Sequence, residues 1–175
     1  CTAAALVYGF THNRGWNISL EQQLYDDPIV LTKTTRYQHL VITRNPRTEE
    51  SRLYINGNVQ FSSVDEAVYH EQLVHPVMSL LQDHRRVLIL GGGDGLALRE
   101  VLKYPEVESV HLVDLDPGMV ELASTDPLLT ALNRGAFADA RVHTSVTAAV
   151  TAEGLRPVFM ESGRYNRDGT PVLER

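Results

Sequence analysis

The chain has 175 residues, of which 43% are hydrophobic, and a net charge of -6 with an isoelectric point of about 5.6. This length suits one domain, or a small domain with part of a larger one, and the acidic balance disfavours nucleic acid as the main partner. The single cysteine, Cys1, excludes a disulfide framework and a thiolate metal site, and the seven histidines show no paired ligand spacing, so we expect no metal.

Residues 1–28 form a lead-in whose first part, Cys1 to Phe10, is apolar but too short to cross a bilayer. Two interpretations stay open: an ordinary packed terminus, or the tail of a membrane anchor upstream of residue 1. The lone cysteine suits a reducing compartment, so we expect a cytoplasmic protein, held at the cytoplasmic face of the membrane if such an anchor exists.

Residues 29–62 are expected to form a small antiparallel β domain. Apolar and β-branched runs alternate with turn signals here, and Asn56-Gly57 is the strongest short hairpin signal in the chain. The predicted strands are Ile29–Lys33, Tyr37–Thr43, Arg52–Ile55 and Asn58–Ser62.

A helix is predicted to follow, because Ser63 and Glu66 have capping-box spacing. Pro76 is expected to kink or split this helix near His75. The apolar stripe expected to be buried consists of Val68, Leu73, Val74, Val77, Leu80 and Leu81.

The run from Arg86 to Gly95 predicts a buried strand that breaks into a glycine-rich turn, and Leu96 to Lys103 continue as a helix. A second apolar strand, Ser109 to Val113, ends in Asp114. Strand, glycine turn, helix, strand and terminal acid are typical of a nucleotide-binding βαβ unit. An acid at the tip of the second strand can accept hydrogen bonds from both ribose hydroxyls.

Asp94 lies inside the glycine turn, and its negative charge bears on which ligand the turn can bind. A pyrophosphate bound there would face a carboxylate, which is costly where solvent is partly excluded. The glycines fall at Gly91, Gly93 and Gly95, so Leu96 takes the last glycine position of the dinucleotide spacing. We therefore expect a nucleoside with positive charge, such as a sulfonium, or an amine co-substrate. The alternative is that Asp94 only caps the helix.

Further elements are expected after Asp114. The sequence predicts helices from Asp116-Pro117 to about Ser124 and from Asp126-Pro127 to about Leu132, then a strand at Arg141–Thr144. The run from Ser145 to Gly154 is a helix candidate, and Arg156–Met160 is strand-like. Residues 63–175 are thus predicted to form a Rossmann-like domain.

The motifs that carry a family resemblance occur in order along roughly residues 24–143. In this order and spacing they resemble spermidine synthases, the polyamine aminopropyltransferases, and bacterial members most of all. These motifs are Leu53 to Phe61, Asp65-Glu66, Tyr69-His70-Glu71, Gly91 to Gly95, and Val113-Asp114-Leu115-Asp116.

The resemblance implies an α/β protein with an N-terminal antiparallel β domain and a methyltransferase-type Rossmann-like domain. It implies aminopropyl transfer from decarboxylated S-adenosylmethionine, a co-substrate, to putrescine, which gives spermidine and methylthioadenosine. No cofactor or metal is required, because the sulfonium is already a good leaving group. A homodimer or larger homo-oligomer is also expected.

The resemblance also implies roles for site residues. Gln38 contacts the nucleoside, His70 lies on the polyamine side, Asp94 holds the cationic amine, and Asp114 binds the ribose hydroxyls. Gln60 is a further candidate for the cleft. The bland alternatives are solvent-facing glutamines, a hydrogen-bonded helix histidine, and acids that cap turns.

The sequence departs from the family after Val142, and this departure indicates a discontinuity near residues 143–146. The family's acidic adenine-contacting turn and its proton-accepting aspartate are not found, so no catalytic base is assigned and we expect the 175-residue chain alone to be inactive. Two other functions stay open: a small-molecule S-adenosylmethionine-dependent methyltransferase, and a catalytically inactive domain that binds nucleosides or polyamines.

Overall fold

The computed structural model describes residues 20–146, 150–151 and 154–155, which form two compact units. The first unit contains the described residues up to Thr34 together with His39–Val64. The second contains Thr35–Gln38 and the described residues from Asp65 onward. No helix among the described residues combines the length and the hydrophobicity that a membrane span needs.

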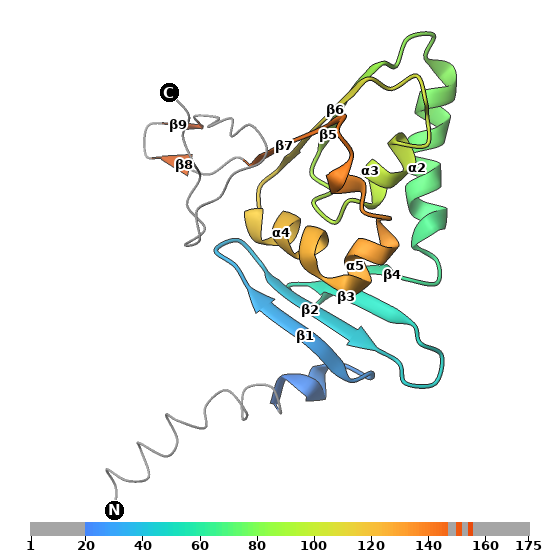
Figure 1. The fold of residues 1–175 in the computed structure, drawn as a ribbon. Coiled ribbons are helices and arrows are strands. Elements are labelled where there is room, and N and C mark those ends of the chain that lie inside the picture. The colour runs from blue at the N-terminus through green and yellow to red at the C-terminus, as the bar shows by residue number, and fades with distance from the viewer. Residues whose placement is uncertain (1–19, 147–149, 152–153, 156–175) are drawn as a thin grey trace, which may run out of the picture. The chain divides into compact units, whose positions relative to one another are not determined.

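The first unit is built on a four-stranded antiparallel sheet with the strand order β1-β2-β3-β4 (Figure 1). This sheet confirms the predicted antiparallel β fold. The short helix η1 (Gln22–Leu24) precedes it. The predicted start of the second strand was wrong, because Tyr37 and Gln38 precede β2 in a loop. The strands are β1 (Ile29–Thr34), β2 (His39–Arg44), β3 (Ser51–Ile55) and β4 (Asn58–Ser62).

The turn between β3 and β4 is the predicted hairpin. Asn56 and Gly57 both have positive φ, 51° and 80°, which matches the right-handed twist of the flanking strands. Leu53 pairs with Phe61 and Tyr54 with Val59, so the residue between them on β4, position 60, forms a β-bulge.

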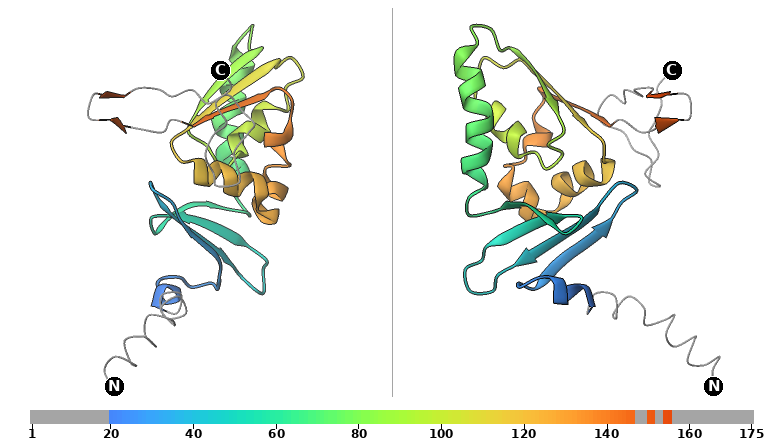
Figure 2. Two further views of the ribbon diagram at one scale, coloured as in Figure 1. Left: turned by 60° about the vertical axis from the view of Figure 1, so that its left-hand side comes forward. Right: turned by 180° about the vertical axis from the view of Figure 1, so that it is seen from behind.

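The second unit contains a parallel sheet with the order β5-β6-β7, which confirms the Rossmann-like prediction (Figures 1 and 2). Helices connect successive strands, so the carboxyl ends of the strands meet at one edge, where α/β folds bind ligands. The elements are α2 (Glu66–Leu80), β5 (Arg86–Leu90), α3 (Leu96–Val101), β6 (Ser109–Asp114), α4 (Pro117–Thr125), α5 (Pro127–Leu132), η2 (Ala136–Ala138) and β7 (Val142–Val146).

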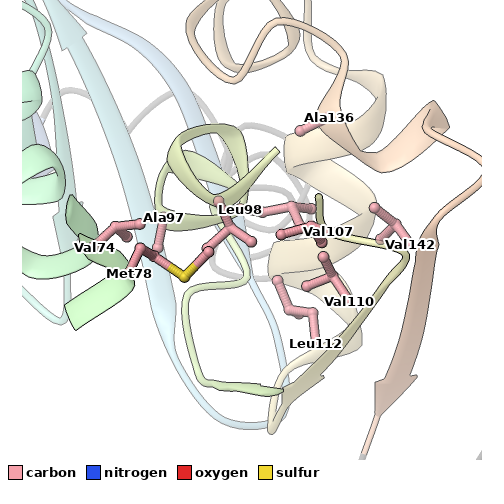
Figure 3. Packing of buried hydrophobic residues seen from close by; sticks show 10 residues of the cluster. Val74, Met78, Ala97, Leu98, Val107, Val110, Leu112, Ala136 and Val142 are labelled. Atoms are coloured by element: carbon pink, nitrogen blue, oxygen red, sulfur yellow. The ribbon is translucent and has the colours of Figure 1, made fainter. Parts of the chain in front are cut away.

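A hydrophobic core joins the helices of this unit to its sheet. Figure 3 shows Val74 and Met78 of α2 beside Ala97 and Leu98 of α3. The remaining buried members are Val101, Val107, Val110, Leu112, Ala136 and Val142. All residues of α3 are buried, so α3 is the central helix of the core. Its packing fixes the position of the glycine turn that precedes it.

The predicted buried stripe of α2 was largely wrong. Leu73, Val77 and Leu80 are 50%, 56% and 83% exposed, and of the predicted residues only Val74 is buried. The buried face instead carries Glu66, His70, Val74 and Met78. The spacing of apolar residues failed to identify the buried face because two of these four positions are ionisable residues that are buried with polar partners.

Two expectations about the ends and the middle of α2 also need correction. The Ser63–Glu66 capping box is not formed: Asp65 is the N-cap residue, without a side-chain hydrogen bond, and Ser63 Oγ accepts from the Ser51 N–H at 2.9 Å. Pro76 does not split the helix, which is continuous. Pro76 lies on an exposed face, where water can hydrate the carbonyl that it leaves unpaired.

The chain after residue 144 also differs from expectation. β7 extends to Val146, and β8 (Val150–Thr151) pairs antiparallel with β9 (Gly154–Leu155), so the helix candidate at Ser145–Gly154 was wrong. β-Branched valine and threonine favour extended structure there. The strand expected at Arg156–Met160 lies outside the described residues.

Substitution of Gly95 tests whether the helix start depends on a glycine. Gly95 has φ 79°, and a Cβ there would lie 2.6 Å from Phe137 Cε2, whereas Gly91 has φ 84° and open space around a Cβ. Left-handed strain should cost Gly91→Ala about 1–2 kcal/mol. Gly95→Ala should cost roughly 1–3 kcal/mol more through overpacking, measured by chemical denaturation. Equal losses would contradict this packing.

Candidate functional site

The glycine turn links β5 to α3 at the carboxyl edge of the parallel sheet. The Gly91 N–H donates to the Val113 carbonyl at 2.7 Å, which holds the turn against β6. A Cβ at Gly93 would lie only 2.7 Å from Asp114 Oδ2. Glycine at position 93 is therefore required by the close approach of the acid, and not by the backbone conformation.

Asp114, the last residue of β6, is half-buried and fixed by two backbone N–H groups. Its Oδ2 accepts from Gly93 at 2.8 Å, and its Oδ1 accepts from Asp116 at 2.8 Å. Each carboxylate oxygen has two lone pairs, so each can accept one further hydrogen bond. This geometry leaves the acid able to bind two vicinal hydroxyl groups beside the turn.

Asp94 is a carboxylate buried in the same turn, with 6% of its surface exposed. Its Oδ1 accepts from the N–H of Leu96, the first residue of α3, at 2.9 Å, while the N-cap residue of this helix is Gly95. Among the described residues no hydrogen bond reaches Oδ2, and the carboxylate forms no ion pair. This hydrogen bond therefore uses one oxygen of the Asp94 carboxylate and leaves the other oxygen for a ligand.

The charge on Asp94 is poorly compensated within the protein. Burial raises its pKa; the Leu96 N–H and the nearby His70 act in the opposite direction, while Asp114 adds to the rise. The balance is a raised pKa, so the ionised form lacks a full partner. A cationic ligand at this position would supply that partner.

His70 lies on the buried face of α2 and has a defined tautomer. Its Nδ1 is 2.7 Å from the Glu66 backbone carbonyl, which can only accept, so Nδ1 carries a proton. The Glu66 carboxylate lies 3.1 Å from the same nitrogen. Nε2 is therefore the nitrogen left for another group. Tyr69 packs edge-on against the imidazole, with ring centroids 5.0 Å apart.

A buried ion network joins α2, which carries His70, to α3, which follows Asp94. Arg99 donates to both oxygens of Glu66, at 2.7 and 2.9 Å, and to Glu100 Oε1 at 2.8 Å. It also donates to the Leu132 carbonyl at 2.8 Å. Burial opposes the charge of Arg99, but the hydrogen bonds to the two glutamates outweigh it and raise its pKa.

Sequence reasoning missed Glu66 and Arg99. One signal was present, because Arg99 and Glu100 stand among apolar residues in a short helix directly after the glycine turn. All six residues of that helix are buried, and buried charges must be paired. The sequence could not show that the partner of Arg99 is Glu66 of α2, which lies 33 residues earlier in the chain.

Three ligand-type side chains, Glu71, His75 and Glu100, place donor atoms within 4.8 Å of one another, as a metal site would. The ammonium group of Lys103 pairs with both carboxylates and so supplies the positive charge itself. Burial would raise the pKa of Glu100, but hydrogen bonds from Lys103 and Arg99 lower it. This group is therefore a closed ion-pair network.

The two glutamines proposed from sequence occupy different settings. Gln38 is half-buried and belongs to the second unit, with Asp94, His70 and Asp114. Gln60 is exposed at the β-bulge of the first unit, where bulges often redirect a side chain next to a site. The second unit thus holds four of the predicted side chains and the glycine turn.

Comparison with known proteins gives consistent matches. Residues 66–152 match the spermine/spermidine synthase domain. The chain is 52% identical over 139 residues to polyamine aminopropyltransferase 2 of Ralstonia nicotianae. The aligned region covers 79% of this chain and 27% of that protein. It is 42% identical over 172 residues to a polyamine aminopropyltransferase of Mycobacterium tuberculosis, covering 94% and 31%.

Solved structures agree with these sequence matches. A spermidine synthase in complex with the transition-state analogue AdoDATO has a TM-score of 0.62 and 33% identity, covering 67% of this chain and 39% of that one. The spermidine synthase of Thermotoga maritima has a TM-score of 0.63 and 32% identity, covering 69% and 41%. The chain spans about a quarter to a third of the length of the curated relatives named above.

Replacing Glu66 by Gln tests the ion network. The change removes the charge that faces Arg99 in a site where Glu66 and Arg99 are only 6% and 9% exposed. Breaking one side of a buried pair should cost on the order of 3 kcal/mol, measured by chemical denaturation. The exposed Glu71 on the same helix is the control, and Glu71→Gln should cost under about 1 kcal/mol. Similar losses would contradict a special role for Glu66.

Proposed function

The chain belongs to the spermine/spermidine synthase family, and on that basis we propose that its protein transfers an aminopropyl group from decarboxylated S-adenosylmethionine to putrescine. The products are spermidine and methylthioadenosine. Support comes from relatives named polyamine aminopropyltransferase and from a site whose acids suit a nucleoside and an amine.

The observation that carries this proposal is the buried Asp94 carboxylate. It lies in a nucleotide-type glycine turn, its pKa is raised by burial, and the described residues give it no ion pair. A diphosphate would add negative charge beside it, whereas an aminopropyl ammonium group would neutralise it. S-Adenosylmethionine itself carries a carboxylate on this arm, so the same position favours the decarboxylated form.

The nucleoside would be held at the carboxyl edge of the sheet. The proposed role of Asp114 is to accept hydrogen bonds from the ribose hydroxyls through the lone pairs that Gly93 and Asp116 leave open. Gln38 is proposed to contact the nucleoside from its loop. Gly91, Gly93 and Gly95 let the backbone pass close to the ligand.

The reaction is a displacement at the carbon beside the sulfonium. A neutral amine of putrescine attacks this carbon, a C–N bond forms, and the C–S bond breaks with its electron pair going to sulfur. The amine loses one proton, for which no base is assigned among the described residues. His70 is proposed on the polyamine side, and Gln60 stays a further candidate for substrate contact. Positioning and electrostatics therefore provide most of the catalysis.

The chemistry needs no added cofactor, because the leaving group is already activated as a sulfonium. Decarboxylated S-adenosylmethionine is thus proposed as a co-substrate and putrescine as the acceptor. We also propose a homodimer or larger homo-oligomer. The exposed apolar residues of α2, among them Leu73, Val77 and Leu80, support self-association.

Asp94→Asn tests amine recognition, because it keeps the size of the side chain and removes its charge. Losing a charge-assisted contact should weaken binding of decarboxylated S-adenosylmethionine by on the order of 1.5–3 kcal/mol, measured by calorimetry. Methylthioadenosine lacks the amine and serves as the matched ligand, with little change expected. Equal losses for both ligands would mean that Asp94 only supports the loop.

The same variant makes a prediction about pH. The folded-state pKa of Asp94 is raised above its unfolded value, so its ionised form destabilises the fold once the pH exceeds both values. Asp94→Asn should therefore be more stable than the unaltered chain at neutral pH. This advantage should shrink as the pH falls through the raised pKa and vanish when the carboxyl is protonated in both states. Thermal unfolding between acidic and neutral pH measures it, and an advantage that grows towards acidic pH would reverse the sign and refute it.

A further inference from the structure

Thr35 begins the loop that carries Gln38, and its hydroxyl is saturated with hydrogen bonds. The oxygen accepts from the backbone N–H groups of Tyr37 at 3.1 Å and Gln38 at 3.0 Å. It lies 2.8 Å from Asp116 Oδ2 and 3.1 Å from the Gln38 carbonyl. The carboxylate is both the nearer and the stronger acceptor, so the hydroxyl donates to Asp116.

Asp116 is placed to receive this hydroxyl. It is 2% exposed, its Oδ1 accepts from the Gly118 N–H at 2.9 Å, and it caps α4 by this bond. Its own N–H donates to Asp114 Oδ1 at 2.8 Å. One continuous hydrogen-bonded path therefore runs from Gly93 through Asp114 and Asp116 to Thr35 and its loop.

Gly118 supplies an independent steric observation. A Cβ at this position would lie 2.5 Å from Thr35 Cγ2 and 3.1 Å from Asp116 Oδ1. Glycine within a helix normally lowers its stability. Here no side chain fits between the first turn of α4 and Thr35, so the glycine permits the contact between Thr35 and Asp116.

We propose that Thr35 and Asp116 are positioning residues that fix the Gln38 loop relative to Asp114. Asp116 then determines the placement of both Gln38 and Asp114, the two residues proposed to hold the nucleoside. It acts on the first through Thr35 and on the second through its own backbone N–H. The inference rests on the proposed function for the roles of Gln38 and Asp114. Thr35 and Asp116 themselves act through these neighbours.

Thr35→Val tests the proposal in the full chain, because it keeps the branched shape and removes only the hydroxyl. Methylthioadenosine is the probe, and its dissociation constant is measured by calorimetry. We expect binding to weaken about tenfold, which is the lower end of the range for a lost hydrogen bond to a charged group. Thr35→Ser keeps the hydroxyl and should restore binding to within about twofold.

A double-mutant cycle with Gln38→Ala separates positioning from general support of the fold. If Thr35 acts through Gln38, Thr35→Val should change binding by less than about twofold when Gln38 is already alanine. Thermal unfolding of every variant verifies that it is folded. Gly118→Ala should reproduce the tenfold loss, because its methyl group pushes Thr35 away from Asp116.

The outcomes separate this inference from the proposed function. If the unaltered chain does not bind methylthioadenosine, the proposed function fails and the inference fails with it. If the unaltered chain binds and Thr35→Val binds equally well, only the inference is overturned. A Thr35→Val loss of the same size in the Gln38→Ala background also overturns it, since the hydroxyl would then not act through Gln38.

Discussion

A charge that is removed from water must find a partner, and this constraint organises the second unit. Glu66, Arg99 and Glu100 are buried, and Arg99 pairs with both glutamates, so α2 and α3 are held together by their charges as well as by the core. Asp94 is equally buried but has no ion pair among the described residues. The network satisfies its own charges, whereas Asp94 is left for a cation from outside. The proposed amine site follows from this difference.

The acids at the sheet edge have divided tasks. Asp114 is fixed by two backbone N–H groups and keeps lone pairs for a ligand, while Asp116 uses its carboxylate for α4 and Thr35. His70 lies on α2 of the same unit, and its Nδ1 is hydrogen-bonded to the Glu66 carbonyl. The proposed site is thus held by contacts between segments distant in sequence, and the side chains of Asp94, Asp114 and His70 are each oriented by a hydrogen bond to a backbone group.

Local signals in the sequence predicted most of the fold. Asn56-Gly57 located the hairpin, and the glycine turn with Asp114 located the βαβ unit, because turn conformations depend on a few adjacent residues. The face of α2 was wrong because Glu66 and His70 are buried with polar partners that come from elsewhere in the chain. The proposed site residues Asp94 and Asp114 were identified through the turn. Thr35 and Arg99 were not, since their partners Asp116 and Glu66 lie 81 and 33 residues away.

The most direct test of the central claim compares three ligands on the unaltered protein by calorimetry: decarboxylated S-adenosylmethionine, S-adenosylmethionine and NAD. A buried Asp94 in the glycine turn, without an ion pair among the described residues, predicts the tightest binding for the decarboxylated ligand, whose arm ends in a cation without a carboxylate. S-Adenosylmethionine should bind at least about tenfold more weakly, because a second carboxylate would face Asp94. NAD should bind more weakly still. Equal or tighter binding of NAD or S-adenosylmethionine would contradict the account.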